Sequence, residues 1–298
     1  AGRILSLQKK IQKSFERKQS RMDQNRMPLV EALQQFREEA PAYFRIPGHR
    51  FERGLDETLN GVSLAAYDLS EAEGLDDLHH AEGVIAEAQK LAAETWKAKK
   101  TFFLVNGTTC GNEAMVLSSV KEGEKIIVPR NVHKSVLMGL ILSGATPVYV
   151  MPEYSTKWQM WGGVTPETIE KAFAETPDAK AVLLVSPTYY GLCSDLQAIA
   201  EICHCHNAAL LVDEAHGSHL YFSEQLPLGA LESGADACAQ SIHKTAGSFT
   251  QSSFLSLGSG RLDEARVAAN LQMVQSTSPS YLLMASLDAA RRGMALHG

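Results

Sequence analysis

Short apolar runs alternate with helix-like stretches from residue 101 onward, and this alternation restricts the fold more than any other feature of the chain. The apolar, β-branched runs are TFFLV (101–105), KIIVP (125–129), TPVYVM (146–151), AVLLVS (181–186) and ALLVDEA (209–215). Between them lie stretches with helical spacing of apolar residues, such as HKSVLMGLIL at 133–142. This succession predicts an α/β fold with a mostly parallel sheet covered by helices on both faces.

The flanking segments predict further elements. AGSFTQSSFLSLG at 246–258 predicts one or two more strands, and two helices are expected near 263–275 and 280–295. EGVIAEAQKLAAETW, at 82–96, also has helical spacing. We therefore expect three segments, which are a basic extension over 1–21, a helical arm with loops over 22–95 and a large α/β domain over 96–298.

Composition excludes several classes of protein. The chain has 298 residues, 45% of them hydrophobic and 21% charged, with a net charge of -6, so neither disorder nor nucleic-acid binding is favoured. No apolar run approaches the roughly 18 residues of a membrane span. Five cysteines do not resemble a secreted disulfide framework. We expect a cytoplasmic protein with no membrane contact.

The first 21 residues are basic and contain a single acid, Glu16. They lack the apolar core of a secretory signal. A solvated helix, an extension from an upstream segment and an organelle-targeting transit segment all remain open as interpretations.

A turn after the first predicted strand is suited to phosphate. That strand ends at Val105, the turn carries Thr108 and Thr109, and a helix is expected to open near Gly111. Amide groups at a helix start, together with two hydroxyls, form a phosphate cradle. The turn matches neither nucleotide fingerprint, Walker or GxGxxG. A well-capped helix without a ligand is the alternative.

Asp213 follows the most hydrophobic predicted strand. A buried carboxylate is costly unless a cation meets it, and the protonated nitrogen of a pyridine ring is one such cation. A Mg²⁺ ligand and a helix-capping aspartate are the competing interpretations.

Lys244, in SIHKTAGSFTQSS, follows a strand-like segment and has the small neighbours Ala246, Gly247 and Ser248. A nucleophilic lysine needs partial burial and room for a planar ligand. Ser241 adds a hydroxyl. A surface lysine is the ordinary alternative. Phosphate turn, strand-end acid and lysine, in this order along one sheet, suit pyridoxal 5'-phosphate.

Eight segments in order also resemble the Orn/Lys/Arg decarboxylases, a group of fold type I pyridoxal-phosphate enzymes. They are FRIPGHR, EGLDDLHHAEGVIAEAQ, FFLVNGTTCGN, PRNVHKSV, SPTYYG, VDEAHGSH, SIHKT and STSPSYLLMASLD. The resemblance runs from about Met22 to the end, so that 22–95 would hold active-site loops and 96–298 the pyridoxal-phosphate-binding large domain.

The resemblance implies roles around the cofactor ring. Lys244 would bind the cofactor aldehyde, and Asp213 would face the pyridine nitrogen. His133 would stack on the ring, while Ala215 would pack under its opposite face.

The resemblance also assigns residues to the phosphate and the reacting centre. Thr108, Thr109 and Ser241 would hold the phosphate, and His243 and His216 would lie beside the reacting centre. Thr277 would reach the phosphate of a neighbouring subunit, which implies a homodimer or a higher oligomer.

Two clusters of potential metal ligands are interpreted differently. ICHCHN, at 202–207, lacks a second ligand pair at zinc spacing, so no metal site is predicted. DDLHH, at 76–80, coincides with a family segment and is interpreted as an active-site loop or a subunit contact.

The resemblance therefore implies decarboxylation of arginine, lysine or ornithine to the corresponding amine. Another fold type I enzyme, such as an aminotransferase or an aldolase-type lyase, remains an alternative because one cofactor serves many reactions. Family members generally continue into a smaller C-terminal domain, which we expect this chain to lack. A truncated, catalytically silent homologue is the third possibility.

Overall fold

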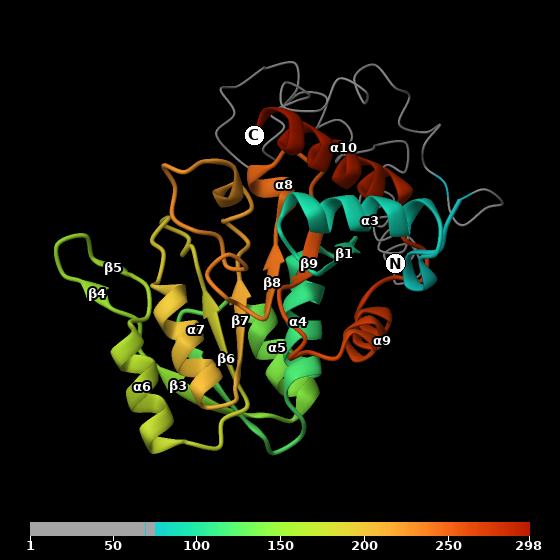
Figure 1. The fold of residues 1–298 in the computed structure, drawn as a ribbon. Helices are drawn as coiled ribbons and strands as arrows, with labels where there is room; N and C mark the ends of the chain where they lie inside the picture. The colour runs from blue at the N-terminus through green and yellow to red at the C-terminus, as the bar shows by residue number, and fades with distance from the viewer. Residues whose placement is uncertain (1–68, 70–74) are drawn as a thin grey trace, which may run out of the picture. The chain divides into compact units, whose positions relative to one another are not determined.

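The computed structural model describes residue 69 and residues 75–298. A seven-stranded sheet runs through this part of the chain, in the order β1-β9-β8-β7-β6-β2-β3 (Figure 1). The strands are β1 (Lys100–Leu104), β2 (Lys125–Pro129), β3 (Thr146–Val150), β6 (Ala181–Val185), β7 (Ala209–Asp213), β8 (Ala237–Gln240) and β9 (Ser253–Leu257). Only β9 runs antiparallel to its neighbours β1 and β8, so the described sheet is mixed and mostly parallel, as predicted.

Helices α4 (Gly107–Ser119), α5 (Lys134–Ser143) and α9 (Glu264–Val274) cover one face of the sheet. Met115 of α4 and Leu140 of α5 pack with Ile126 and Val128 of β2 in one buried cluster. Successive strand residues point to opposite faces, which is why every second apolar residue of β2 belongs to this layer.

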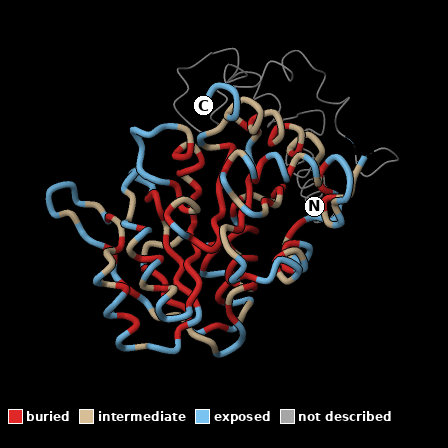
Figure 2. The backbone as a smooth tube through the Cα atoms, in the orientation of Figure 1, coloured by how far each residue is buried: buried red, intermediate tan, exposed pale blue. Residues whose placement is uncertain are grey.

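The other face is covered in two parts. Helices α6 (Pro166–Glu175) and α7 (Leu196–Cys205) pack on it over β2, β6 and β7, where Ile127 and Phe173 share a cluster. Helices α3 (Val84–Thr95) and α10 (Tyr281–His297) pack over β1 and β9, where Phe103 and Phe254 stack 5.1 Å apart. Figure 2 shows the strands buried between these helices.

Short elements connect the layers. They are the 3₁₀ turns η3 (Leu78–His80) and η4 (Leu220–Phe222), the hairpin strands β4 (Tyr154–Ser155) and β5 (Met160–Trp161), and the single-turn helix α8 (Ile242–Thr245). The element that carries Lys244 is therefore a short helix directly after β8.

The expected start of one helix was wrong. Helix α4 begins at Gly107, four residues before the expected start, so Thr108 and Thr109 lie within its first turn. Gly107 adopts a positive φ of 74°, which a glycine reaches without steric cost and which lets the chain turn directly from β1 into the helix.

The segment 1–21 and residues 22–68 and 70–74 lie outside the described part of the chain. Of the expected helical arm, α3 and η3 are described. Among the described residues, no helix is long and apolar enough to cross a membrane.

Candidate active site

A cavity of about 820 Å³ lies at the carboxyl ends of the parallel strands, where open α/β sheets bind their ligands. Nine of the ten predicted site residues line it. They are Thr108, Thr109, His133, Asp213, Ala215, His216, Ser241, His243 and Lys244. Four separate elements or connections of the fold thus bring these residues to one cavity.

The first turn of α4 forms one wall. Its Ncap residue, Asn106, makes no side-chain capping bond, and the first amide groups of a helix have no intrahelical partners. The Thr108 hydroxyl lies 2.5 Å from Ser241 Oγ and 3.0 Å from Ser253 Oγ. Exposed amides and clustered hydroxyls at a helix start are suited to a phosphate group.

Asp213 ends β7 and is 3% exposed. Its Oδ1 accepts a hydrogen bond from the Ala215 amide (3.2 Å), and its Oδ2 accepts one from Asn112 Nδ2 (2.8 Å). Burial raises the pKa of Asp213, and the Asn112 bond opposes that shift. No described cation forms an ion pair with this carboxylate. A buried carboxylate is unfavourable without a cationic partner, and the N–H of a protonated pyridine ring could be that partner.

Lys244 lies across the same cavity. Its Nζ is 3.3 Å from His216 Nε2. Burial lowers the pKa of the Lys244 amine, with the Asp213 charge acting against this, and a lowered pKa favours the neutral, nucleophilic amine. Burial, followed by the Lys244 charge, lowers the pKa of His216 to about 4, so its ring is neutral near pH 7 where it contacts the Lys244 amine.

The two remaining histidines are held by backbone groups. His243 donates from Nδ1 to the Ser252 carbonyl (2.8 Å), and burial lowers its pKa. His133 is the Ncap residue of α5 and accepts from the Ser135 amide. Ala215 is buried directly after the end of β7.

Sequence reasoning missed several lining residues. Asn112 contacts Asp213, Tyr189 meets the His216 ring edge-to-face at 5.6 Å, and Trp161 reaches the cavity from β5. Asn112 had a usable signal, because it lies four residues after Thr108 and therefore on the same helix face. Tyr189 lies in the family-like segment SPTYYG, which could have drawn attention to it, whereas Trp161 had no comparable signal.

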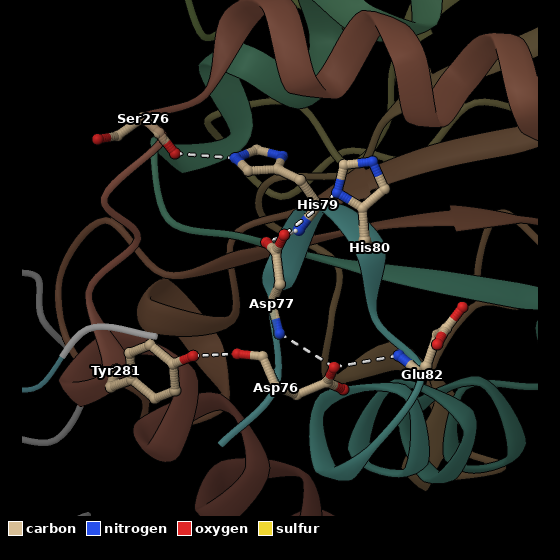
Figure 3. A network of polar contacts seen from close by, with 7 residues as sticks. All are labelled: Asp76, Asp77, His79, His80, Glu82, Ser276 and Tyr281. Atoms are coloured by element: carbon tan, nitrogen blue, oxygen red, sulfur yellow. Dashed lines mark hydrogen bonds and ion pairs between the residues drawn. The ribbon is translucent and has the colours of Figure 1, made fainter. Parts of the chain in front are cut away.

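Two predicted features lie outside the cavity lining. Thr277 is exposed on the connection between α9 and α10, and its contact with a neighbouring subunit stays a prediction. The segment 76–80 does not line the cavity either. Figure 3 shows that it links α3 to the Ser276–Tyr281 connection, because His79 Nε2 bonds the Ser276 carbonyl (2.9 Å) and Tyr281 donates to the Asp76 carbonyl.

The histidines of ICHCHN have other partners. His204 bonds the buried Asp236 (3.0 Å), and His206 stacks on Phe173 at 4.3 Å. Within the described residues, no group of three potential metal ligands comes together.

Comparison with known proteins identifies a family whose members resemble this chain over most of its length. A family model described as Orn/Lys/Arg decarboxylase, major domain, matches residues 27–297. An arginine decarboxylase of Halalkalibacterium halodurans is 46% identical over 92% of this chain and 57% of its own length. An arginine decarboxylase of Bacillus subtilis is 43% identical over 93% of the chain and 57% of its length. The chain thus spans just over half the length of these relatives.

Solved structures agree with the fold. Lysine decarboxylase A from Pseudomonas aeruginosa has a TM-score of 0.68 and 26% identity, over 90% of this chain and 40% of that protein. Serine palmitoyltransferase from Sphingomonas wittichii, with a TM-score of 0.57, 18% identity and coverage of 86% and 56%, shares the fold alone. The match over residues 27–297 and the 43–46% identity to its relatives show that this chain belongs to the Orn/Lys/Arg decarboxylase family.

Proposed function

We propose that this chain is the cofactor-binding part of a decarboxylase that uses pyridoxal 5'-phosphate to convert a basic amino acid into its amine. One observation carries the proposal, which is that Asp213 and Lys244 open onto the same cavity as the first turn of α4. These three features match the ring nitrogen, the aldehyde and the phosphate of one molecule.

When bound, pyridoxal phosphate supplies an electron sink for the pair of electrons that loss of CO₂ leaves behind. The chain's residues hold this group in place. Thr108, Thr109 and Ser241 bind the phosphate, while Asp213 accepts the ring N–H and keeps the ring protonated. His133 and Ala215 cover the two faces of the ring.

Lys244 has two tasks in this proposal. Its amine would hold the cofactor through the aldehyde, and its Nζ would supply the proton that the substrate α-carbon gains when CO₂ is lost. His216 Nε2, 3.3 Å away, orients that amine. His243 is the second candidate for the proton donor.

The distal cation of the substrate needs an acidic partner. Among the described lining residues, Asp213 is the single carboxylate, and the proposal commits it to the ring nitrogen. We therefore infer that the acid which selects between arginine, lysine and ornithine comes from outside this set. The relatives at 43–46% identity are named arginine decarboxylases, so arginine is the first substrate to test.

The test is to load the purified chain with pyridoxal phosphate and supply arginine, lysine and ornithine in turn. Release of CO₂ with an equal amount of the matching amine supports the proposal. Lys244→Ala should abolish release, whereas Lys121→Ala, an exposed lysine outside the cavity, should leave it unchanged. Formation of a 2-oxo acid would indicate an aminotransferase instead, and cofactor binding without turnover a silent homologue.

Assembly and location belong to the same proposal. A homodimer or higher oligomer is expected, and sedimentation of the purified chain tests it.

Each of the five cysteines, all in the described part, is unpaired, which supports a reducing compartment such as the cytoplasm. Fractionation of cells tests that location.

A further inference from the structure

Asn112 lines the cavity and bonds two residues on different elements, of which Asp213 also lines the cavity. It sits on α4 and is 1% exposed. Its Nδ2 donates to Asp213 Oδ2 at 2.8 Å and to the hydroxyl of Ser135, on α5, at 2.9 Å. One amide group therefore uses both of its hydrogens, and it joins the end of β7 to the start of α5.

The orientation of this amide follows from its partners. If the side chain were rotated by half a turn, Oδ1 would face the carboxylate oxygen of Asp213, and two acceptors would repel each other. In the observed orientation, Asn112 Oδ1 is buried and has no hydrogen-bond partner in the described part of the chain. A buried unpaired oxygen is unfavourable, so the two donated bonds outweigh that cost.

The Ser135 branch reaches His133. The Ser135 amide donates to His133 Nδ1 (3.2 Å), and the Ser135 hydroxyl lies 2.8 Å from the same nitrogen. A backbone N–H can only donate, so Nδ1 carries no hydrogen, and the neutral ring carries its hydrogen on Nε2. Because the hydroxyl oxygen accepts from Asn112, its own hydrogen is directed toward Nδ1.

We propose that Asn112 is a positioning residue that orients the Asp213 carboxylate and the His133 ring through a single amide. This inference rests on the proposed function, in which Asp213 and His133 are the groups that face the bound ring. Through Asp213, Asn112 strengthens recognition of a protonated ring nitrogen. Through Ser135, it directs the hydroxyl hydrogen toward His133 Nδ1 and so reinforces the tautomer that the Ser135 amide selects.

The first test compares two ligands, pyridoxal phosphate and its 1-deaza analogue, in which a C–H replaces the ring nitrogen. Asn112→Leu keeps much of the side-chain volume and removes both donations. Since a hydrogen bond to a charged group contributes more than a neutral one, we expect binding of pyridoxal phosphate to weaken about tenfold. Binding of the deaza analogue should change far less. Equal weakening of both ligands, or of neither, would overturn the inference.

The second test begins without the cofactor. In the cofactor-free chain with ¹⁵N-labelled histidine, the nitrogen shifts of His133 should report the tautomer with its hydrogen on Nε2. Ser135→Ala removes the hydroxyl branch and leaves the Asn112–Asp213 bond, so it should preserve the preference for pyridoxal phosphate over the analogue. A hydrogen on Nδ1 in the unmodified chain contradicts the inference.

A matched control separates positioning from folding. Asn270 of α9 is also buried, and its amide donates to Ser118 Oγ (2.9 Å), away from the cavity lining. Asn270→Leu should lower the melting temperature without changing the ligand preference. If Asn112→Leu fails to fold, Asn112→Asp, which has nearly the same shape, should lose the preference. If the unmodified chain binds neither ligand, the proposed function fails, and the histidine shifts still test the Ser135–His133 branch of the network.

Discussion

Two carboxylates, Asp213 and Glu214, are adjacent at the end of β7 and have different hydrogen-bond partners. Glu214 is fully buried and accepts from the Ala230 amide (2.7 Å), the Tyr221 hydroxyl (2.8 Å) and Gln240 (2.8 Å). Burial raises its pKa to about 7, against the effect of those bonds. Asp213 accepts two described bonds and faces the cavity. Glu214 thus stabilises the fold through bonds within the protein, whereas Asp213 can also bind a ligand in the cavity.

At the residue scale, His216 predicts a pH dependence of stability in the cofactor-free chain. Its pKa falls from 6.5 to about 4 because burial and the Lys244 charge disfavour protonation. A pKa lowered by folding means that the unfolded chain binds the proton more tightly. The contribution of His216 is therefore fully present above pH 6.5 and is lost as the pH falls toward 4.

His216→Gln should reduce the loss of unfolding free energy between pH 6.5 and 4, measured by urea denaturation at several pH values. The matched control is His297→Gln, an exposed histidine at the end of α10. A variant whose pH profile equals that of the unmodified chain would show that His216 is not responsible.

At the scale of an element, Asp76 determines how α3 begins. Its carboxylate accepts from five backbone amides, those of Asp77, Glu82, Gly83, Ile85 and Ala86. Burial alone would raise the pKa of Asp76, but the amide bonds outweigh it and lower the pKa. The Ncap residue of α3, Gly83, has no side chain to perform this task.

Asp76→Ala should therefore lower the free energy of unfolding by about 2 kcal/mol, the upper end for loss of a helix cap. Asp195→Ala removes an ordinary cap of α7, with one amide bond of 3.1 Å, and should cost about 1 kcal/mol. Urea denaturation of both variants measures the difference. An Asp76 variant as stable as the Asp195 variant would contradict the anchoring role.

Elements with strong periodicity were predictable from the sequence. β2 has the predicted bounds, because its apolar spacing and the flanking turn residues agree. The start of α4 was misplaced although Asn106 is a common capping residue, and its side chain accepts from the Ser276 amide instead of capping the helix. The hairpin of β4 and β5 has strands of two residues, too short for a period to be detected.

Site residues such as Asp213 and Lys244 were predictable, because a strand-end carboxylate and an amine among small residues are the residue types that the cofactor's chemistry requires. Contacts such as Asn112–Asp213 were not, because the two residues are 101 positions apart and come together only through the order of the strands. That order places β9 between β1 and β8, and local patterns do not encode it.

At the scale of the whole described sheet, one strand supports both layers. Leu183 and Leu184 of β6 are neighbours and fully buried, yet they belong to the clusters on opposite faces. Leu183→Ala and Leu184→Ala should each lower the free energy of unfolding by about 3 kcal/mol, because each leaves a cavity in a packed layer.

Both variants should unfold in a single transition at a lower urea concentration, as followed by circular dichroism and tryptophan fluorescence. Leu226→Ala, a 38% exposed leucine, is the control and should change stability by less than about 0.5 kcal/mol. Two separate transitions in either core variant would show that the layers do not fold as one unit.

The central claim concerns one covalent bond, between the Lys244 amine and pyridoxal phosphate. The direct measurement is to add pyridoxal phosphate to the purified chain, reduce with borohydride, digest and locate the added pyridoxyl phosphate mass by tandem mass spectrometry. The account predicts that mass on Lys244, with none on Lys134, which lines the same cavity. A label on another lysine, with Lys244 unmodified, would contradict it.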